Sequence, residues 1–120
     1  ETDFGIQNGA DALDLLLQAK PRPTAVMCGN DVLAVGALRR AKELGIAVPT
    51  DLSITGFDDI EIAQIVDPSL TTVHVPHREM GRKAATELVE MVERRSDGAS
   101  IELDTFLQLR KSLVSPSSQG

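Results

Sequence analysis

Apolar residues recur along the chain at two spacings, and each spacing predicts one kind of element. Residues 8–19 carry apolar side chains three or four positions apart, which predicts a helix that ends before Pro21 and Pro23. Residues 24–28 form a short, continuous apolar run, which predicts a strand buried on both faces. The pattern thus begins with a helix that is followed by a buried strand.

A second helix is predicted directly after this strand. Asn30 is suited to cap its first turn, and the charge of Asp31 complements the helix dipole. Helical spacing of apolar residues continues to Gly45, which stands where a glycine often ends a helix. Residues 52–56 then predict a second strand, and residues 60–65 predict a short helix.

The second half of the chain predicts a third strand, a long helix and a final strand. Residues 71–75 form the third strand, and residues 77–94 place apolar side chains on one stripe with charges opposite, as in an amphipathic helix. A turn is expected at residues 96–99, and the alternation over residues 101–109 predicts the final strand. Residues 115–120 are polar, and we expect them to form a frayed tail.

This order of elements predicts an α/β fold. Strands that alternate with helices typically form an open, mostly parallel sheet flanked by helices. Right-handed crossovers bring the carboxyl ends of such strands to one edge of the sheet, and ligands bind outside that edge. Residues that directly follow the strands are therefore the candidates for function.

Polar side chains follow all three predicted strands. They are Asn30 and Asp31 after the first strand, Asp58 and Asp59 after the second, and His74 and His77 near the end of the third. A carboxylate accepts hydrogen bonds from two neighbouring hydroxyls, so Asp58 suits a polyol or a ribose, and the alternative role of Asp58 is to cap the short helix that follows. Asp59 is assigned mainly to capping the short helix that follows. The amide of Asn30 suits a hydroxyl or the edge of a heterocycle, and it equally suits the helix cap.

Composition narrows the possible partners. The formal net charge is −6 and the isoelectric point is near 4.8, so we do not expect this chain to bind DNA directly. No run of 18 apolar residues is present, so no membrane partner is expected. The aromatic residues are three phenylalanines, of which Phe57 lies beside the candidate site and could stack on a ligand ring.

The sequence offers little for catalysis or metal binding. His74 and His77 have no evident third ligand nearby, so we expect no metal and no cofactor. The single cysteine, Cys28, lies in an apolar strand and is expected to pack in the core. No nucleophile elbow or glycine-rich phosphate loop occurs, and no catalytic residue is assigned. A phosphoacceptor receiver domain would need a lysine after a later strand, and none follows residues 71–75.

Several separate motifs resemble the effector-binding core of the lac-repressor-like family of transcription regulators. They occur in the family's order, and they are PTAVMCGND at 23–31, GALR at 36–39, VPTDLSITGFDDI at 48–60, LTTV at 70–73 and EMGRKA at 79–84. The resemblance implies one lobe of a periplasmic-binding-protein-like fold that senses a small molecule.

The resemblance also implies roles for individual residues. In the family, the residues that match Asn30 and Asp58 hydrogen-bond a sugar or nucleobase effector between two subdomains. Phe57 and His74 are assigned to the same ligand-binding site. The position of Val75 is often glutamine in the family, so Val75 indicates a more apolar effector or compensation by His74.

The resemblance further implies that the chain is about the last third of such a regulator. Residues 1–114 would be the carboxy-terminal part of the effector-binding domain, with helix 77–94 belonging to the other, missing lobe and 115–120 a flexible tail. Operator DNA would bind only through an absent amino-terminal head. We expect a cytoplasmic protein that forms a homodimer, or a fragment that self-associates through the uncovered stripe of this helix.

Two other functions remain as alternatives. The first is a lobe of a periplasmic sugar-binding transport protein, a class that typically carries glycine at the position of Asp59, so the pair Asp58-Asp59 favours the cytoplasmic regulators. The second is an enzyme, for which the sequence offers no activated nucleophile.

Overall fold

The computed structural model describes residues 5–95 and 97–116, and it divides into two compact units. Among the described residues, 5–74 and 107–116 form the first unit, and Val75–Phe106 forms the second. Ser96 in the predicted turn and residues 117–120 of the predicted tail lie outside the described residues.

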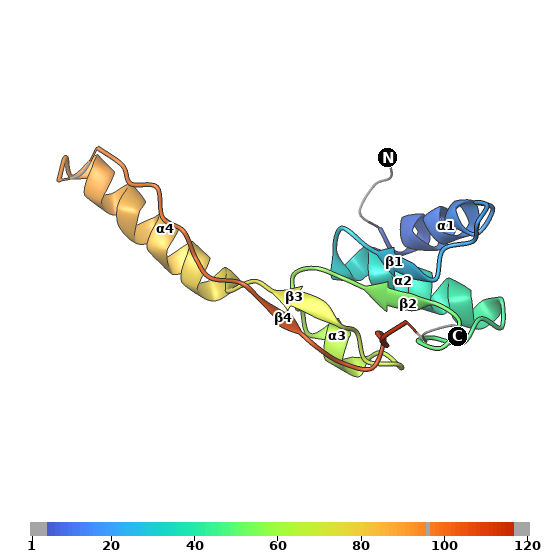
Figure 1. Cartoon of the computed structure of the whole chain (residues 1–120). Helices are drawn as coiled ribbons and strands as arrows, with labels where there is room; N and C mark the ends of the chain where they lie inside the picture. The colour runs from blue at the N-terminus through green and yellow to red at the C-terminus, as the bar shows by residue number, and fades with distance from the viewer. Residues whose placement is uncertain (1–4, 96, 117–120) are drawn as a thin grey trace. The chain divides into compact units, whose positions relative to one another are not determined.

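Helices and strands alternate along the chain as predicted (Figure 1). The first unit contains α1 (Ile6–Leu16), β1 (Ala25–Met27), α2 (Asp31–Glu43), β2 (Ser53–Thr55), α3 (Ile62–Ile65) and β3 (Thr72–His74). The second unit contains α4 (His77–Val92), and β4 (Phe106–Gln108) begins at its last residue.

The strands of the first unit run in the same direction. β1 pairs with β2 in a parallel ladder in which Val26 lies opposite Ile54. Parallel bridges from Thr55 to Thr71 and from Asp58 to His74 continue the pairing from β2 to the segment of β3. The predicted α/β fold with a parallel sheet is therefore confirmed, and the carboxyl ends of the three strands meet at one edge.

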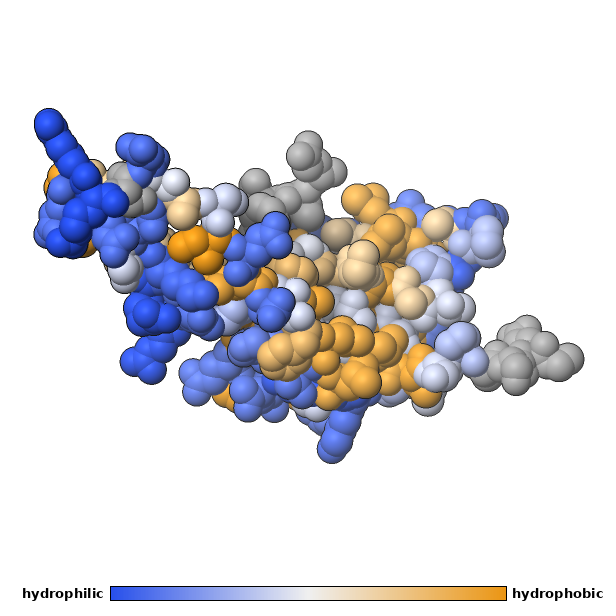
Figure 2. Space-filling view, turned by 60° about the vertical axis from the view of Figure 1, so that its left-hand side comes forward, coloured by the Kyte–Doolittle hydropathy of each residue, from blue (hydrophilic) through white to orange (hydrophobic). Residues whose placement is uncertain are grey.

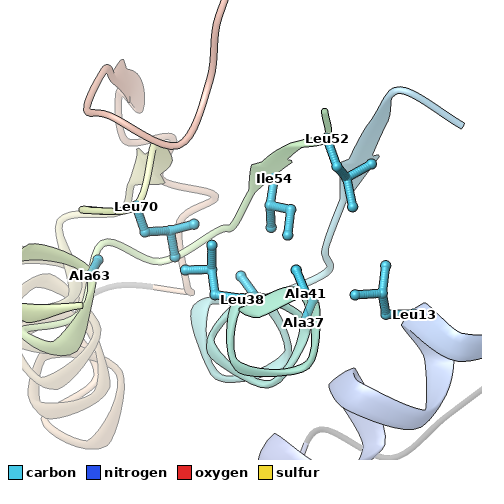
Figure 3. Close-up of a cluster of buried hydrophobic side chains, with 9 residues drawn as sticks. Leu13, Ala37, Leu38, Ala41, Leu52, Ile54, Ala63 and Leu70 are labelled. Atoms are coloured by element: carbon cyan, nitrogen blue, oxygen red, sulfur yellow. The ribbon is translucent and has the colours of Figure 1, made fainter. Parts of the chain in front are cut away.

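The hydrophobic core of the first unit lies between α2 and the sheet. Figure 3 shows Ala37, Leu38 and Ala41 of α2 on the side of the helix that faces Ile54 and Leu52. Leu13 of α1 joins the cluster beside Ala41, and Ala63 and Leu70 complete it beyond Leu38. Gly36 permits this packing of α1 on α2, because a Cβ there would lie 1.9 Å from the carbonyl oxygen of Ile6.

The prediction that the first strand is buried on both faces is wrong. In β1, Val26 packs against the core, whereas Ala25 is exposed and 87% of the surface of Met27 is open to solvent. The reason is that α2 covers one face of β1, and no described residue buries Met27 on the other. β1 is thus half-buried, with the alternation of a one-sided strand.

The end of α2 follows the predicted pattern. Gly45 has a φ of 70°, and its N–H donates to the carbonyl of Lys42 while the N–H of Ile46 donates to that of Ala41. These two bonds form the glycine-terminated turn expected from the sequence. Within the described residues, no helix is long and apolar enough to cross a membrane.

The second unit buries little of its apolar surface. α4 has the predicted amphipathic pattern, yet none of its residues is buried, and Met80, Leu88 and Met91 are each at least 45% exposed. Figure 2 shows apolar side chains open to solvent among hydrophilic ones on the face in view. The final strand is shorter than the predicted 101–109, because only Phe106–Gln108 pairs, with β3.

Candidate functional site

Asn30 lies at the carboxyl end of β1 and caps α2. Its Oδ1 accepts a hydrogen bond of 2.8 Å from the N–H of Leu33, so the capping role of Asn30 is confirmed. Among the described residues, nothing accepts a hydrogen bond from its Nδ2. The cap therefore fixes the side chain while leaving an amide donor for a ligand.

Asp31 is fully buried and holds the ends of the strands together. Its Oδ1 accepts from the hydroxyl of Thr72 at 2.5 Å, and its Oδ2 accepts from the N–H of Ile60 at 2.9 Å. Its own N–H donates to the carbonyl of Phe57 at 2.9 Å. Gly56 leaves space for this carboxylate, since a Cβ there would lie 2.3 Å from Oδ1. Sequence reasoning assigned Asp31 to the helix dipole alone and missed these contacts.

Asp58 follows β2 in a conformation that L-residues rarely adopt. Its φ is 113°, and its N–H donates to the carbonyl of Val73 at 3.0 Å. A side chain other than glycine is strained at such a φ, and strain of this kind is typical of binding sites. The backbone bonds of Asp31 to Phe57 and of Asp58 to Val73 place the ends of three strands side by side.

Asp59 does not cap the following helix, so that assignment is wrong. The N–H of Ile60 is taken by Asp31, and α3 begins later, at Ile62. The carboxylate of Asp59 instead lies 2.8 Å from Nδ1 of His74 and 2.6 Å from a guanidinium nitrogen of Arg110. Asp59 has a φ of 58°, which an aspartate tolerates better than most residues.

Arg110 is a site residue that sequence reasoning missed. It is mostly buried, and besides Asp59 its guanidinium donates to the carbonyl of Leu70 at 2.9 Å. Its backbone N–H donates to the hydroxyl of Thr71 at 2.9 Å. An arginine after an expected strand was the available signal, but the pairing spans 51 positions and no local pattern indicates it.

The charges around Asp59 decide its ionisation. Burial raises the pKa of this carboxyl, but the hydrogen bonds from His74 and Arg110 outweigh burial and bring the pKa below its ordinary value. Asp59 is therefore a carboxylate at neutral pH. It can only accept hydrogen bonds, so both His74 and Arg110 donate to it.

The other predicted site residues differ in their placement. Phe57 is 42% exposed directly before Asp58, and the side chain of His74 is 36% exposed. Val75 directly follows His74 and is the first residue of the second unit. Phe57 and His74 are thus both accessible to a ligand at the edge where the strands end.

Neither Cys28 nor a metal-binding cluster adds a second candidate among the described residues of the first unit. Burial raises the pKa of the Cys28 thiol to about 11, so this cysteine stays a protonated thiol that packs against the core. In the described part of the chain, no group of three or more His, Cys, Asp or Glu side chains could hold a metal. A cavity of about 490 Å³ lies within the second unit, between α4 and residues 99–103.

The chain is similar to known proteins over most of its length. A family model described as a periplasmic binding protein-like domain matches residues 1–113. The HTH-type transcriptional repressor PurR of Proteus mirabilis is 44% identical over 113 residues, which are 93% of this chain and 33% of that protein. The chain thus spans about a third of the length of the curated relatives it matches.

Solved structures of similar proteins share the fold. A putative LacI transcriptional regulator from Bacillus cereus matches with a TM-score of 0.89 and 32% identity, over 93% of this chain and 40% of that one. A LacI family regulator from Enterococcus faecium with bound ribose matches with a TM-score of 0.86 and 31% identity, over 93% and 41%. These relatives confirm the resemblance to lac-repressor-like regulators drawn from the motifs.

The contacts of Asp59 predict how stability depends on pH. The folded-state pKa of Asp59 is lowered, so its contribution is present above the ordinary pKa near 4 and is lost as the pH falls through the folded-state value. We expect Asp59→Asn to lower the free energy of unfolding by about 1–3 kcal/mol at pH 7. The difference from the unsubstituted chain shrinks below pH 4. Urea unfolding between pH 2 and 7 measures it, with the exposed Asp67→Asn as the control. A difference that stays constant over this range contradicts the role of the Asp59 charge.

Proposed function

The chain belongs to the periplasmic binding protein-like domain family, and we propose that it is the effector-sensing part of a lac-repressor-like transcription regulator. Asn30 and Asp58 lie at the ends of neighbouring parallel strands, and their placement there supports this function. An amide and a carboxylate on one rim form a recognition surface for a small polar molecule.

The chemistry of this rim favours an effector rich in hydroxyl groups. Asp58 accepts hydrogen bonds from hydroxyls, and Nδ2 of Asn30 donates one. The exposed ring of Phe57 offers an apolar face for a sugar or a nucleobase. The ribose bound by the Enterococcus faecium relative supports a sugar or nucleoside-like effector. Val75 stands where the family often has glutamine, so the site favours an effector that is less polar at that position.

The division into two units supports the domain assignment. We place residues 1–114 in the carboxy-terminal part of the effector-binding domain, with 115–120 as its tail. Helix 77–94, which contains α4, belongs to the second lobe. Two observations support this placement. Val75–Phe106 forms a compact unit of its own, and none of the residues of α4 is buried.

Regulation follows from differential binding. An effector held between two lobes favours the closed arrangement, and a change in closure alters the affinity of a separate helix-turn-helix head for operator DNA. The coupling is reciprocal, so operator DNA changes effector affinity by the same factor. The chain itself binds and does not catalyse, it acts in the cytoplasm where operator DNA lies, and it touches no membrane. The repressor relative favours this function over a periplasmic transport lobe.

Substitution of Asp58 tests the binding role. In the intact regulator we expect Asp58→Asn to weaken the effector by about 1.5–3 kcal/mol, because a charged hydrogen-bond acceptor is lost. A thermal-shift screen of sugars, nucleosides and small acids supplies the effector, and calorimetry measures the affinity. Asp67→Asn is the matched control, since this exposed aspartate lies in the loop between α3 and β3, near Lys42 and Gly45.

Two results would contradict the proposal. The first is an unchanged affinity in Asp58→Asn. The second is tight, micromolar binding of the effector by the 120-residue chain alone, because half of the proposed cleft would then be dispensable.

We also expect the chain to self-associate through α4. Its exposed stripe includes Met80, Leu88 and Met91, which form one wall of the cavity of about 490 Å³. Apolar surface of this kind gains free energy when a second copy covers it. Gel filtration at micromolar concentration should give a species larger than a monomer, and Leu88→Glu should shift the species toward the monomer. A clean monomer for the unsubstituted chain would disprove self-association.

A further inference from the structure

The side chain of His74 is held by its Nδ1, on the side that faces Asp59. The two atoms lie 2.8 Å apart, and the histidine side chain is 36% exposed while that of Asp59 is only 9% exposed. The contact thus joins an accessible ring to a buried carboxylate. Since the imidazole ring is rigid and planar, anchoring Nδ1 also fixes the orientation of Nε2.

The carboxylate of Asp59 is itself held in place by Arg110. The Arg110 side chain is 13% exposed, and its guanidinium donates to Asp59 at 2.6 Å and to the carbonyl of Leu70 at 2.9 Å. The Arg110 backbone is tied in turn to Thr71. An arginine with this many fixed contacts has little freedom to move, so it holds the carboxylate in one position.

The charge on Asp59 determines which nitrogen of His74 carries the proton. An ionised carboxylate has no hydrogen to donate, so the 2.8 Å contact requires a proton on Nδ1. In the neutral ring, Nε2 is then a hydrogen-bond acceptor. Neighbouring groups commonly fix the tautomer of a functional histidine in this manner.

We propose that Arg110 and Asp59 are positioning residues that hold His74 in the Nδ1–H tautomer, so that Nε2 accepts a hydrogen bond from a hydroxyl or N–H group of the effector. This inference rests on the proposed function, because it places His74 at the same rim as Asp58. With Asp58 also accepting, the rim selects an effector that offers two donors, such as a sugar with neighbouring hydroxyls. A molecule with only acceptor groups, such as a fully methylated sugar, is excluded.

The tautomer can be measured without any effector. Long-range proton–nitrogen correlation spectra of the ¹⁵N-labelled chain at pH 9 report which imidazole nitrogen is protonated. The chain has two histidines, so His77→Gln assigns the signals of His74. We expect the Nδ1–H form for His74, whereas an unconstrained imidazole prefers Nε2–H. A dominant Nε2–H form, or an average of the two forms, overturns the inference whether or not any variant folds.

A substitution then tests the cause. Asp59→Ala removes the carboxylate that accepts from Nδ1, and we expect His74 to shift toward Nε2–H while His77 keeps its signals. A folded Asp59→Ala variant with an unchanged Nδ1–H form overturns the role of Asp59. These spectra do not depend on effector binding, so their outcome is separate from that of the Asp58→Asn test. If His74 lacks the Nδ1–H form, the proposed sensor function is unaffected. If Asp58→Asn leaves the affinity unchanged, the assignment of the His74 tautomer is unaffected.

Discussion

The buried carboxylate of Asp31 is the interaction on which the rim of the sheet depends. It accepts hydrogen bonds from Thr72 in β3 and from Ile60 beyond β2, and its own N–H binds the carbonyl of Phe57. One residue at the start of α2 thus links the segments after β1 and β2 to the first residue of β3. A buried carboxylate that loses its partners is left without hydrogen bonds, which costs about 1–3 kcal/mol or more. Other arrangements of the strand ends that break these contacts are therefore unfavourable.

The three acidic residues Asp31, Asp58 and Asp59 have different roles in the site. Asp31 is fully buried and structural, Asp59 is nearly buried and holds His74, and Asp58 remains at the accessible edge in a strained conformation. A strained residue persists only where its surroundings fix it, and the backbone bond of Asp58 to Val73 does so. The rigid pair stabilises the rim, which leaves Asp58 as the acid assigned to the effector.

Local patterns predicted the order of elements, the parallel strands and the ends of α2, because apolar spacing, a capping asparagine and a terminal glycine act over a few residues. The same patterns failed where contacts with distant segments determine the role or the burial of a residue. The partners of Asp59 are Arg110 and His74, 51 and 15 positions away, and the assignment to a helix cap ignored both. The exposure of Met27 likewise depends on what covers β1, which the apolar run of residues 24–28 does not reveal.

The sensor function requires the effector to bind at the edge where β1, β2 and β3 end. Hydrogen–deuterium exchange of the intact regulator, with and without a sugar or nucleoside that raises its melting temperature, locates the bound effector. We expect slower exchange within residues 28–33, 56–60 and 72–75, while the far ends of α1 and α2 stay unchanged. Unaltered exchange in all three segments, with protection appearing only elsewhere in the regulator, would contradict this function.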